Sequence, residues 1–288
     1  MSDVADKPSA SKGLKSLRLT PTAAIAGIIL IFWIIVAFFG PALAPYGEAE
    51  IIGESFGPIG GEGLLGTDKL GRDILTRLLY GVRTTLFLAL ITTVISFVVG
   101  VVLGFSAAIL RGWFDICISR LVEAFMAFPS TMLALVVIGA MGTSITVLIM
   151  TVGLVLSIGV FRVSRAIGMD ISVMDYVESA RARGEGVWWI ITREVLPNAM
   201  PPLIAEFGLR FTFSILFLSG LSFLGLGVQE PAADWGLMVQ ENMGGIFLGS
   251  SSALIPAACI ASLTICMNLI VDWFQQRQQG ETVLEKME

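Results

Sequence analysis

The chain has 288 residues with a net charge of −5, and 55% of its residues are apolar while only 14% are charged. Soluble domains are about one-quarter charged, so this composition excludes an ordinary soluble protein and indicates an integral membrane protein. The acidic balance argues against nucleic acid as a partner, and the absence of histidine excludes a histidine-based triad or zinc site.

The chain begins with a polar, basic segment over residues 1–20, which we expect to be a cytoplasmic tail. A first transmembrane helix is expected over 21–46, because Ile25 to Ala42 is nearly continuous apolar sequence and can cross a core of about 30 Å. A secretory signal is the alternative, but this apolar region is longer than the ~7–15 residues that such signals use.

A polar, glycine-rich segment follows over 47–83, and we expect it on the outer, periplasmic side of the membrane. Near its end apolar residues such as Ile74 and Leu78 recur at helical spacing, with Arg72 and Arg77 on the opposite side. This pattern predicts an interfacial amphipathic helix that lies along the membrane surface. The segment lacks the Gly-Lys-Ser/Thr ending of a P-loop, so nucleotide binding is not expected here.

Residues 84–274 are predicted to form a five-helix core, in which Pro129 kinks the second helix, and a polar tail is expected over 275–288. The spans are expected near 84–110, within 124–161 as two helices separated at 139–144, at 203–226 and at 254–273. The predicted fold class is therefore all-α, a polytopic membrane protein with six transmembrane helices.

The longest charged stretch between apolar segments is a loop over 170–200. Asp175 can cap a short helix, with Glu178 three residues on in a capping-box arrangement, and Gly184 can supply the left-handed residue that ends this helix. A second short helix is expected over 187–196, ended by the proline that follows it. Two short helices that meet at a glycine form a protruding elbow, which suits docking better than catalysis.

The distribution of basic residues predicts the orientation in the membrane. Of the 18 lysines and arginines, only Lys69, Arg72, Arg77 and Arg83 fall in segments on the side opposite to this loop. The positive-inside rule therefore places the loop and both termini in the cytoplasm. Arginines that flank the spans, such as Arg162 and Arg165, are interpreted as snorkelling anchors rather than as substrate ligands.

At the elbow the sequence resembles the permease subunits of ATP-binding-cassette importers. Their cytoplasmic coupling loop reads Glu-Ala-Ala, three residues, Gly, nine residues, Ile, one residue, Leu-Pro. The matching positions here are Glu178, Ser179, Ala180, Gly184, Leu196 and Pro197, with Ser179 in place of an alanine and Glu194 in place of the isoleucine. The stretches 66–83, 128–130 and 222–229 are similar to the peptide and nickel branch of these permeases, in its C-type subunit, whereas Glu230 and the tail over 275–288 depart from its pattern.

The resemblance implies the fold of a type I importer permease in the bacterial inner (plasma) membrane. It implies three kinds of partner: a paralogous permease that completes a heterodimer, two ATPase subunits that use ATP and Mg, and an extracytoplasmic solute-binding protein. This chain itself is expected to bind no cofactor and to catalyse no reaction. The residues expected to dock an ATPase are Glu178, Ser179, Ala180, Ala182, Gly184, Leu196 and Pro197.

The transport mechanism is indicated by what the spans lack. Ion-coupled carriers normally need buried charged groups near the membrane midplane, and these spans contain almost none away from their ends. The chain also has no Walker A sequence, so energy is expected to come from a partner through the elbow. The resemblance implies a di- or oligopeptide substrate, with nickel chelates, glutathione or unusual oligosaccharides as alternatives.

Hydroxyl and amide groups in the last two spans are candidates for lining the pathway, namely Ser214, Ser219, Thr264 and Asn268. Such residues are more often helix-packing residues than substrate ligands. Two other classes of function stay open from the sequence. A self-contained channel or facilitator for a small polar solute would need no ATPase, and a structural membrane anchor would need no pathway.

Overall fold

The computed structural model describes residues 20–285, and within that range the chain is helical without any strand. The elements are α2 (Pro21–Leu43), α3 (Ile74–Leu110), α4 (Gly112–Met126), α5 (Ser130–Met141), α6 (Ile145–Ile171), α7 (Asp175–Ala182), α8 (Val187–Ile190), the π-helix η1 (Ile191–Val195), α9 (Leu196–Phe223), α10 (Trp235–Asn242), the 3₁₀-helix η2 (Met243–Leu248) and α11 (Leu254–Glu285). The all-α fold class is confirmed. The predicted tail over 1–20 lies almost entirely outside the described residues.

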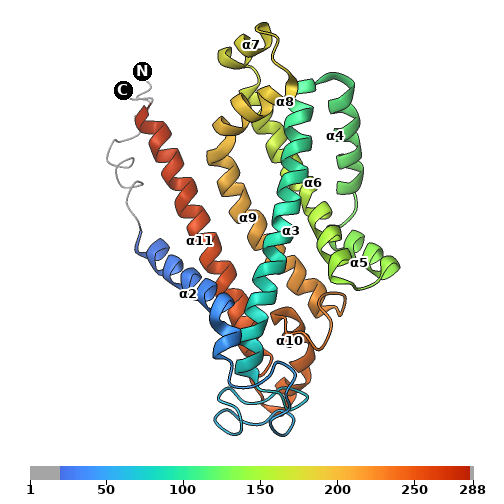
Figure 1. The fold of residues 1–288 in the computed structure, drawn as a ribbon, viewed down its shortest axis with the longest axis vertical. Coiled ribbons are helices and arrows are strands. Elements are labelled where there is room, and N and C mark those ends of the chain that lie inside the picture. Colours follow the sequence, from blue (N-terminus) through green and yellow to red (C-terminus); the bar gives the residue numbers. More distant parts are fainter. Residues whose placement is uncertain (1–19, 286–288) are drawn as a thin grey trace, which may run out of the picture.

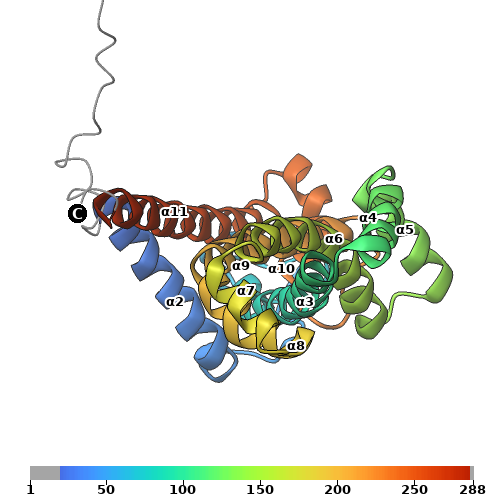
Figure 2. The ribbon, with the colours of Figure 1, turned by 90° about the horizontal axis from the view of Figure 1, so that it is seen from above.

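Five helical stretches of the described chain are long and apolar enough to cross a membrane, and the bent pair of α4 and α5 makes six if it is counted as one broken span. Figure 1 shows α3 running through the middle of the bundle beside α6 and α9, with α2 and α11 on one side and α4 and α5 on the other. The view from above in Figure 2 shows the same order. With α4 and α5 counted together, the number of spans agrees with the predicted six.

The broken span corrects the predicted third helix. Instead of a kinked helix that begins near 124, α4 begins at Gly112, directly after α3, and α5 follows at an angle of 87°. Pro129 stands at the N-cap of α5. A proline after a short irregular turn can therefore separate two helices rather than bend one, because its ring and its missing N–H interrupt the helical hydrogen bonds.

The predicted surface helix before the second span is wrong. Its residues form the first turns of α3, which continues without a break from Ile74 to Leu110. Ile74 and Leu78 are buried in the main hydrophobic core, while Arg77 on the other side is fully buried against carboxylates. The charged side of these turns is thus buried in protein rather than open to solvent, and the helix joins the bundle.

The other helix ends also extend beyond their expected bounds. The fifth span begins at Leu196 rather than 203, because α9 follows directly on η1. The last helix, α11, runs on to Glu285, so most of the residues expected as a polar tail over 275–288 continue this helix. Residues 286–288 of that tail lie outside the described part.

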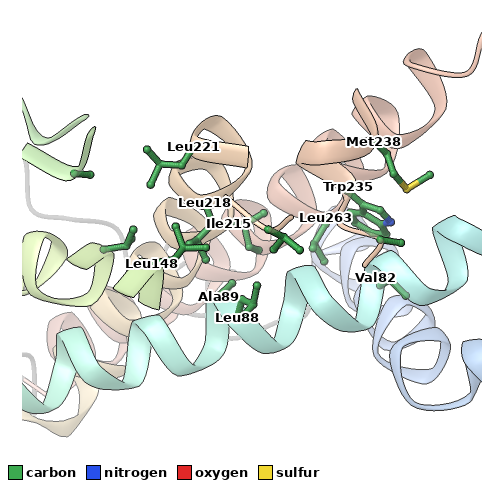
Figure 3. Packing of buried hydrophobic residues seen from close by; sticks show 14 of the residues in the cluster. Val82, Leu88, Ala89, Leu148, Ile215, Leu218, Leu221, Trp235, Met238 and Leu263 are labelled. Carbon is green, nitrogen blue, oxygen red and sulfur yellow. The ribbon is translucent and has the colours of Figure 1, made fainter. Parts of the chain in front are cut away.

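The main core lies between the central helices and α10. Figure 3 shows Leu88 and Ala89 of α3 facing the leucine and isoleucine side chains of α9, with Trp235 of α10 beside Val82. Members of this core include Val82, Leu88, Ala89, Leu148, Ile215, Leu218, Leu221, Trp235, Met238 and Leu263. Many apolar side chains outside it, such as Phe38 at 77% exposure, are open to the outside of the bundle, as expected for a surface that contacts lipid or another membrane subunit.

Helices α3 and α6 approach each other closely through small residues. A Cβ added at Gly100 would lie 2.5 Å from the Cβ of Val160, and one added at Gly104 would lie 2.8 Å from the carbonyl oxygen of Phe161. Glycines four residues apart form a flat strip on a helix and allow two backbones to pack in van der Waals contact. This strip holds α6, and therefore the start of the loop after it, against α3.

A compact cap closes one end of the bundle, formed by residues 44–73 and 224–253, the lower part of Figure 1. Its centre is a buried ion network that also includes Arg77 at the start of α3. The Oδ2 atom of Asp68 accepts hydrogen bonds from Arg72 Nε and Arg77 Nη1, each at 2.6 Å. The Oε2 atom of Glu241 accepts from the same two side chains, at 3.1 Å from Arg72 Nη2 and 2.6 Å from Arg77 Nη1.

Asp73, which lies close to Asp68 in the sequence, has a different role. Arg77 pairs with Asp68 and Glu241, whereas Asp73 caps α3 by accepting from the Thr76 N–H at 2.8 Å. Burial alone would raise the pKa of Asp68, but the Arg72 N–H and the two guanidinium groups together hold it below its usual value. Asp68 is therefore an ionised, buried anchor of the cap.

Trp235 fastens the cap to the spans. Its indole Nε1 donates to the Leu78 carbonyl oxygen of α3 at 3.3 Å, and its ring packs edge-on against Trp33 of α2 with 4.9 Å between the centroids. The neighbouring Asp234 caps α10 through the Leu237 N–H and accepts from Thr85 Oγ1 at 2.8 Å. One short helix of the cap thus holds two spans at fixed positions.

Candidate functional site

The elbow lies at the end of the bundle opposite the cap and consists of α7, the turn at Gly184 and α8 (Figure 1). The predicted N-cap is wrong by one residue, because Met174 occupies the N-cap and Asp175 is the first helical residue. Met174 makes no side-chain cap bond. Asp175 and Glu178 instead place negative charge in the first turn, where it interacts favourably with the positive end of the helix dipole.

The turn after α7 is confirmed. Gly184 has a φ of +83°, the left-handed conformation that the sequence predicts there. The Glu185 N–H donates to the Ala180 carbonyl oxygen at 3.2 Å, and the Gly184 N–H donates to the Arg181 carbonyl oxygen at 2.9 Å. This pair of bonds is a Schellman motif, which satisfies two carbonyl groups at the helix end and fixes the direction of the chain.

The second predicted helix of the elbow is only partly right. The helix that begins at Val187 does not end at Pro197, since α8, η1 and α9 follow one another without a loop up to Phe223. Pro197 lies in the first turn of α9, directly after the π-helical turn of η1. Helices accommodate local irregularities with such π-turns, so the proline is tolerated inside the helical run. The elbow is therefore joined directly to a membrane span.

A small second core seats the elbow on the end of α3. Its buried members are Phe105 and Ile109 of α3, Val177 and Ala180 of α7, Ile190, Ile191 and Val195 of α8 and η1, and Ala199 and Leu203 of α9. Both arms of the elbow contribute to this core. A force on the elbow would therefore reach α3 and α9 together.

The predicted docking residues divide into an exposed and an internal group. Ala180 is fully buried and packs inside this chain, so its small side chain positions α7 and is not open to a partner. Leu196 is half-buried beside the same core. The exposed members are Glu178, Ser179, Ala182, Gly184 and Pro197. These exposed residues are the surface that a docking partner could contact.

The four predicted pathway residues differ in burial and in hydrogen bonding. Ser214 is fully buried, and its Oγ lies 2.9 Å from Thr93 Oγ1 of α3, which joins two helices. Thr264 donates to the Ile260 carbonyl oxygen of its own helix at 2.9 Å. Ser219 is buried without a hydrogen bond to its hydroxyl, and Asn268 is exposed. The hydroxyl groups of Ser214 and Thr264 are therefore already hydrogen-bonded within this chain.

Two ion pairs along the spans were not predicted from the sequence. Arg165 of α6, interpreted as an anchor, has its Nη2 2.6 Å from Asp115 Oδ2 of α4, which ties α4 to α6. Arg210 of α9 has its Nε 2.6 Å from Glu206 Oε1, an i, i+4 pair. Only the second pair has a signal in the sequence, because the spacing of four places both side chains on one helix face.

An all-helical bundle with five apolar spans in its described part, or six if α4 and α5 together form one, has the architecture of a polytopic membrane protein, with a cap at one end and the elbow at the other. In comparison with known protein families, residues 100–280 match the family described as binding-protein-dependent transport system inner membrane component. The chain belongs to this family, the permease subunits of ATP-binding-cassette importers.

The alignments with three relatives cover most of both chains. A glutathione transport system permease protein of Pectobacterium atrosepticum is 32% identical over 255 residues, which are 87% of this chain and 84% of that protein. A putative peptide transport system permease protein of Brucella suis is 34% identical over 251 residues, 85% of this chain and 83% of that protein. A dipeptide transport system permease protein of Bacillus subtilis is 32% identical over 255 residues, 88% and 80% of the two chains.

Membership settles the class of function. The chain is a multi-pass protein of the bacterial inner membrane with the type I importer permease fold, and it is a transport subunit. Importers of this class work with ATPase and substrate-binding subunits. A self-contained channel is not favoured, because the matched relatives are permeases of binding-protein-dependent transport systems.

Proposed function

We propose that this chain forms half of the translocation pathway for di- or oligopeptides and is driven by two ATPase subunits that hold the elbow. A paralogous permease supplies the other half, ATP and Mg are used in the ATPases, and an extracytoplasmic binding protein delivers the substrate to the cap. Several of the relatives are named as peptide or dipeptide permeases, which supports this substrate class. Glutathione, as in the name of another relative, is the alternative ligand.

The observation that carries the proposal is the continuity of the elbow with the membrane span. From Val187 to Phe223 the chain is one helical run, and its first turns are buried against the end of α3. A partner that moves α7 and α8 therefore moves α9 and α3 as a rigid unit. ATP-driven closure of two ATPases can in this way shift the population between two arrangements of the spans.

The first experiment tests docking. The tagged chain is purified from its host membranes, and the capture of an ATP-binding-cassette ATPase is quantified for wild type and for Glu178→Lys combined with Gly184→Pro. We expect the double variant to lose the ATPase. Asp170→Lys is the matched control, because Asp170 is an exposed carboxylate at the end of α6 that lies outside the elbow.

Transport in proteoliposomes separates the competing functions. The proposal expects uptake of a radiolabelled dipeptide that needs ATP, the ATPases and the binding protein. Flux through the purified chain alone, without ATP, would instead support a channel. Loss of the ATPase in the control variant as well as in the double variant would contradict the role of the elbow.

A second experiment tests the orientation, in which both termini and the elbow are cytoplasmic. Single cysteines are placed at the exposed positions Ser179 in the elbow and Ile59 in the cap, after replacement of the exposed Cys117. A membrane-impermeant maleimide should label Ile59→Cys in intact spheroplasts and Ser179→Cys only in inside-out vesicles. Labelling of Ser179→Cys from outside would overturn the proposal.

A further inference from the structure

An open pocket of about 560 Å³ lies beside the elbow, between α7 and the junction of α3 with α4. It is lined by Arg111, Ser172, Val173, Glu178, Arg181 and Ala182. The coupling-loop pattern covers only the α7 side of this pocket. The opposite side comes from Arg111, which no sequence motif singles out.

The backbone of Arg111 has an unusual conformation. Its φ is +51° and its ψ is −163°, a region that residues other than glycine rarely occupy. Gly112, the next residue, has a φ of +61°, so the sharp turn from α3 into α4 uses two consecutive residues with positive φ. Glycine would fit at position 111 without strain. An arginine there is therefore a sign that its side chain has a function.

The side chain of Arg111 is held in place toward the pocket. Its Nη2 donates to Ser172 Oγ at 3.0 Å, and the buried Ser172 hydroxyl donates in turn to the Met169 carbonyl oxygen at 2.8 Å. Arg181, on the other wall, is exposed. Neither arginine makes an ion pair within the described part of the chain, and Glu178 is also unpaired there. The pocket therefore has one net positive charge and free guanidinium donors.

We propose that this pocket is a second docking point for the ATPase, which inserts an aspartate or glutamate side chain between Arg111 and Arg181. The inference rests on the proposed function, in which an ATPase contacts the exposed face of α7. A guanidinium group binds a carboxylate through two parallel hydrogen bonds, so a pre-positioned arginine selects an acidic side chain. Because Arg111 ends α3 and Arg181 belongs to α7, a bound carboxylate would connect the elbow to α3 on its outer surface.

The test measures ATPase binding to the permease in nanodiscs made of zwitterionic lipid only. Arg111→Gly removes the guanidinium but suits the backbone, so we expect an unchanged melting temperature and ATPase binding that is weaker by roughly tenfold, the scale of a partly exposed interfacial ion pair. Arg111→Lys keeps the positive charge and should therefore weaken ATPase binding less than Arg111→Gly does. Arg120→Ala is the control, because Arg120 is an exposed arginine of α4 whose side chain is 79% accessible.

A cross-linking experiment identifies the occupant. A carbodiimide should join the amine of Arg111→Lys to one acidic residue of the ATPase, found by mass spectrometry, and should leave Arg120→Lys without a link to the ATPase. If wild type binds the ATPase and Arg111→Gly binds it equally well, the pocket inference is wrong while the proposed function stands. If wild type binds no ATPase, the proposed function fails as well. An effect of Arg111→Gly that needs anionic lipid would assign the pocket to a lipid headgroup and overturn the inference.

Discussion

The cap and the elbow are the two polar ends of the same bundle, and they treat their charges in opposite ways. In the cap the side chains of Asp68, Arg72, Arg77 and Glu241 are at most 4% exposed and are paired with one another. At the other end, Glu178 and Arg181 of the elbow and Arg111 beside it are exposed and have no ion-pair partner in the described chain. The central charges of the cap are therefore paired within its own structure, whereas the elbow pairs Arg183 only loosely, at 3.9 Å from Glu185 and Glu194, and leaves Glu178 and Arg181 unpaired in the described chain.

The difference has a physical reason. A buried charge is stable only when a fixed partner lies beside it, so a network such as the one in the cap permits a single arrangement of the segments that carry it. An exposed charge on a rigid base costs little and can pair with another molecule. The cap is thus built to hold α2, α3, α9 and α11 at one end, and the elbow is built to present a defined surface.

The largest expected effect tests the cap. Arg77→Leu leaves the buried carboxylates of Asp68 and Glu241 without one shared partner, so we expect a loss of about 3–5 kcal/mol in the free energy of unfolding. Thermal and denaturant unfolding in detergent measures this loss. Arg83→Leu is the matched control, since Arg83 is an exposed arginine six residues on in the same helix. Equal losses for the two variants would show that the ion network does not stabilise the cap.

The next effect tests the fit of α10 against α9. A Cβ at Gly236 would lie 2.6 Å from the carbonyl oxygen and 2.7 Å from the Cα of Ser219, which are backbone atoms and cannot turn aside. Gly236→Ala should therefore cost about 1–3 kcal/mol, as overpacking does. Gly244→Ala, where a Cβ meets nothing within 4 Å, should cost much less. The melting temperatures of the two variants measure this difference. A Gly236→Ala variant as stable as wild type would contradict the close approach of α10 to the backbone of α9.

Much of the fold was predictable because it depends on local sequence. Long apolar runs give the number of spans, and Gly184 gives the turn of the elbow, because the left-handed conformation is a property of the residue itself. The prediction of a surface helix was wrong because the position of this helix depends on a contact with a residue far away in the sequence. Arginines on one side of a helix predict that this side faces solvent. Arg77 instead contacts Glu241, which is 164 residues further along the sequence. A pattern in one dimension cannot distinguish water from such a carboxylate.

The candidate site shows the same limit. The coupling-loop pattern selects the right segment but does not separate Ala180, which is fully buried in this chain, from Ala182, which is exposed. That distinction depends on where Phe105 of α3 packs, and no spacing within the loop encodes it. Arg111 was missed because its turn joins two helices that the sequence suggested were separated by a loop.

A smaller effect tests the elbow with two neighbouring glycines. A Cβ meets nothing within 4 Å at either Gly184 or Gly186, but only Gly184 has a positive φ. Gly184→Ala should destabilise the turn by about 1–2 kcal/mol, the cost of the left-handed conformation for other residues. Gly186→Ala should cost less, because Gly186 is the N-cap of α8 in an extended conformation that alanine can adopt. Hydrogen exchange of the α7 amides and ATP-dependent uptake measure the result. Similar hydrogen exchange of the α7 amides in both variants would contradict the requirement for glycine in the turn at Gly184.

The smallest effect lies at the rim of the cap and depends on pH. The neighbouring Glu241 carboxyl and then the Lys69 ammonium lower the pKa of Glu230 to about 2. Because the pKa is lower in the folded state, the ion pair between Lys69 Nζ and Glu230 Oε1, at 2.8 Å, stabilises the protein above about pH 4.5, and this contribution is lost as the pH falls toward about 2. The Glu230 side chain is 43% exposed, so solvent screening limits the contribution to less than about 1 kcal/mol.

Glu230→Gln should therefore lower the melting temperature slightly at about pH 7, and the difference from wild type should shrink steadily as the pH approaches about 2. In a Lys69→Met background the same substitution should have a smaller effect, since the double-mutant cycle removes the shared ion pair. An effect as large as that of Arg77→Leu would mean that an exposed rim pair holds the cap as strongly as the buried network, against the difference proposed between them. A small effect would show that burial, rather than the number of charges, makes one end of this permease rigid.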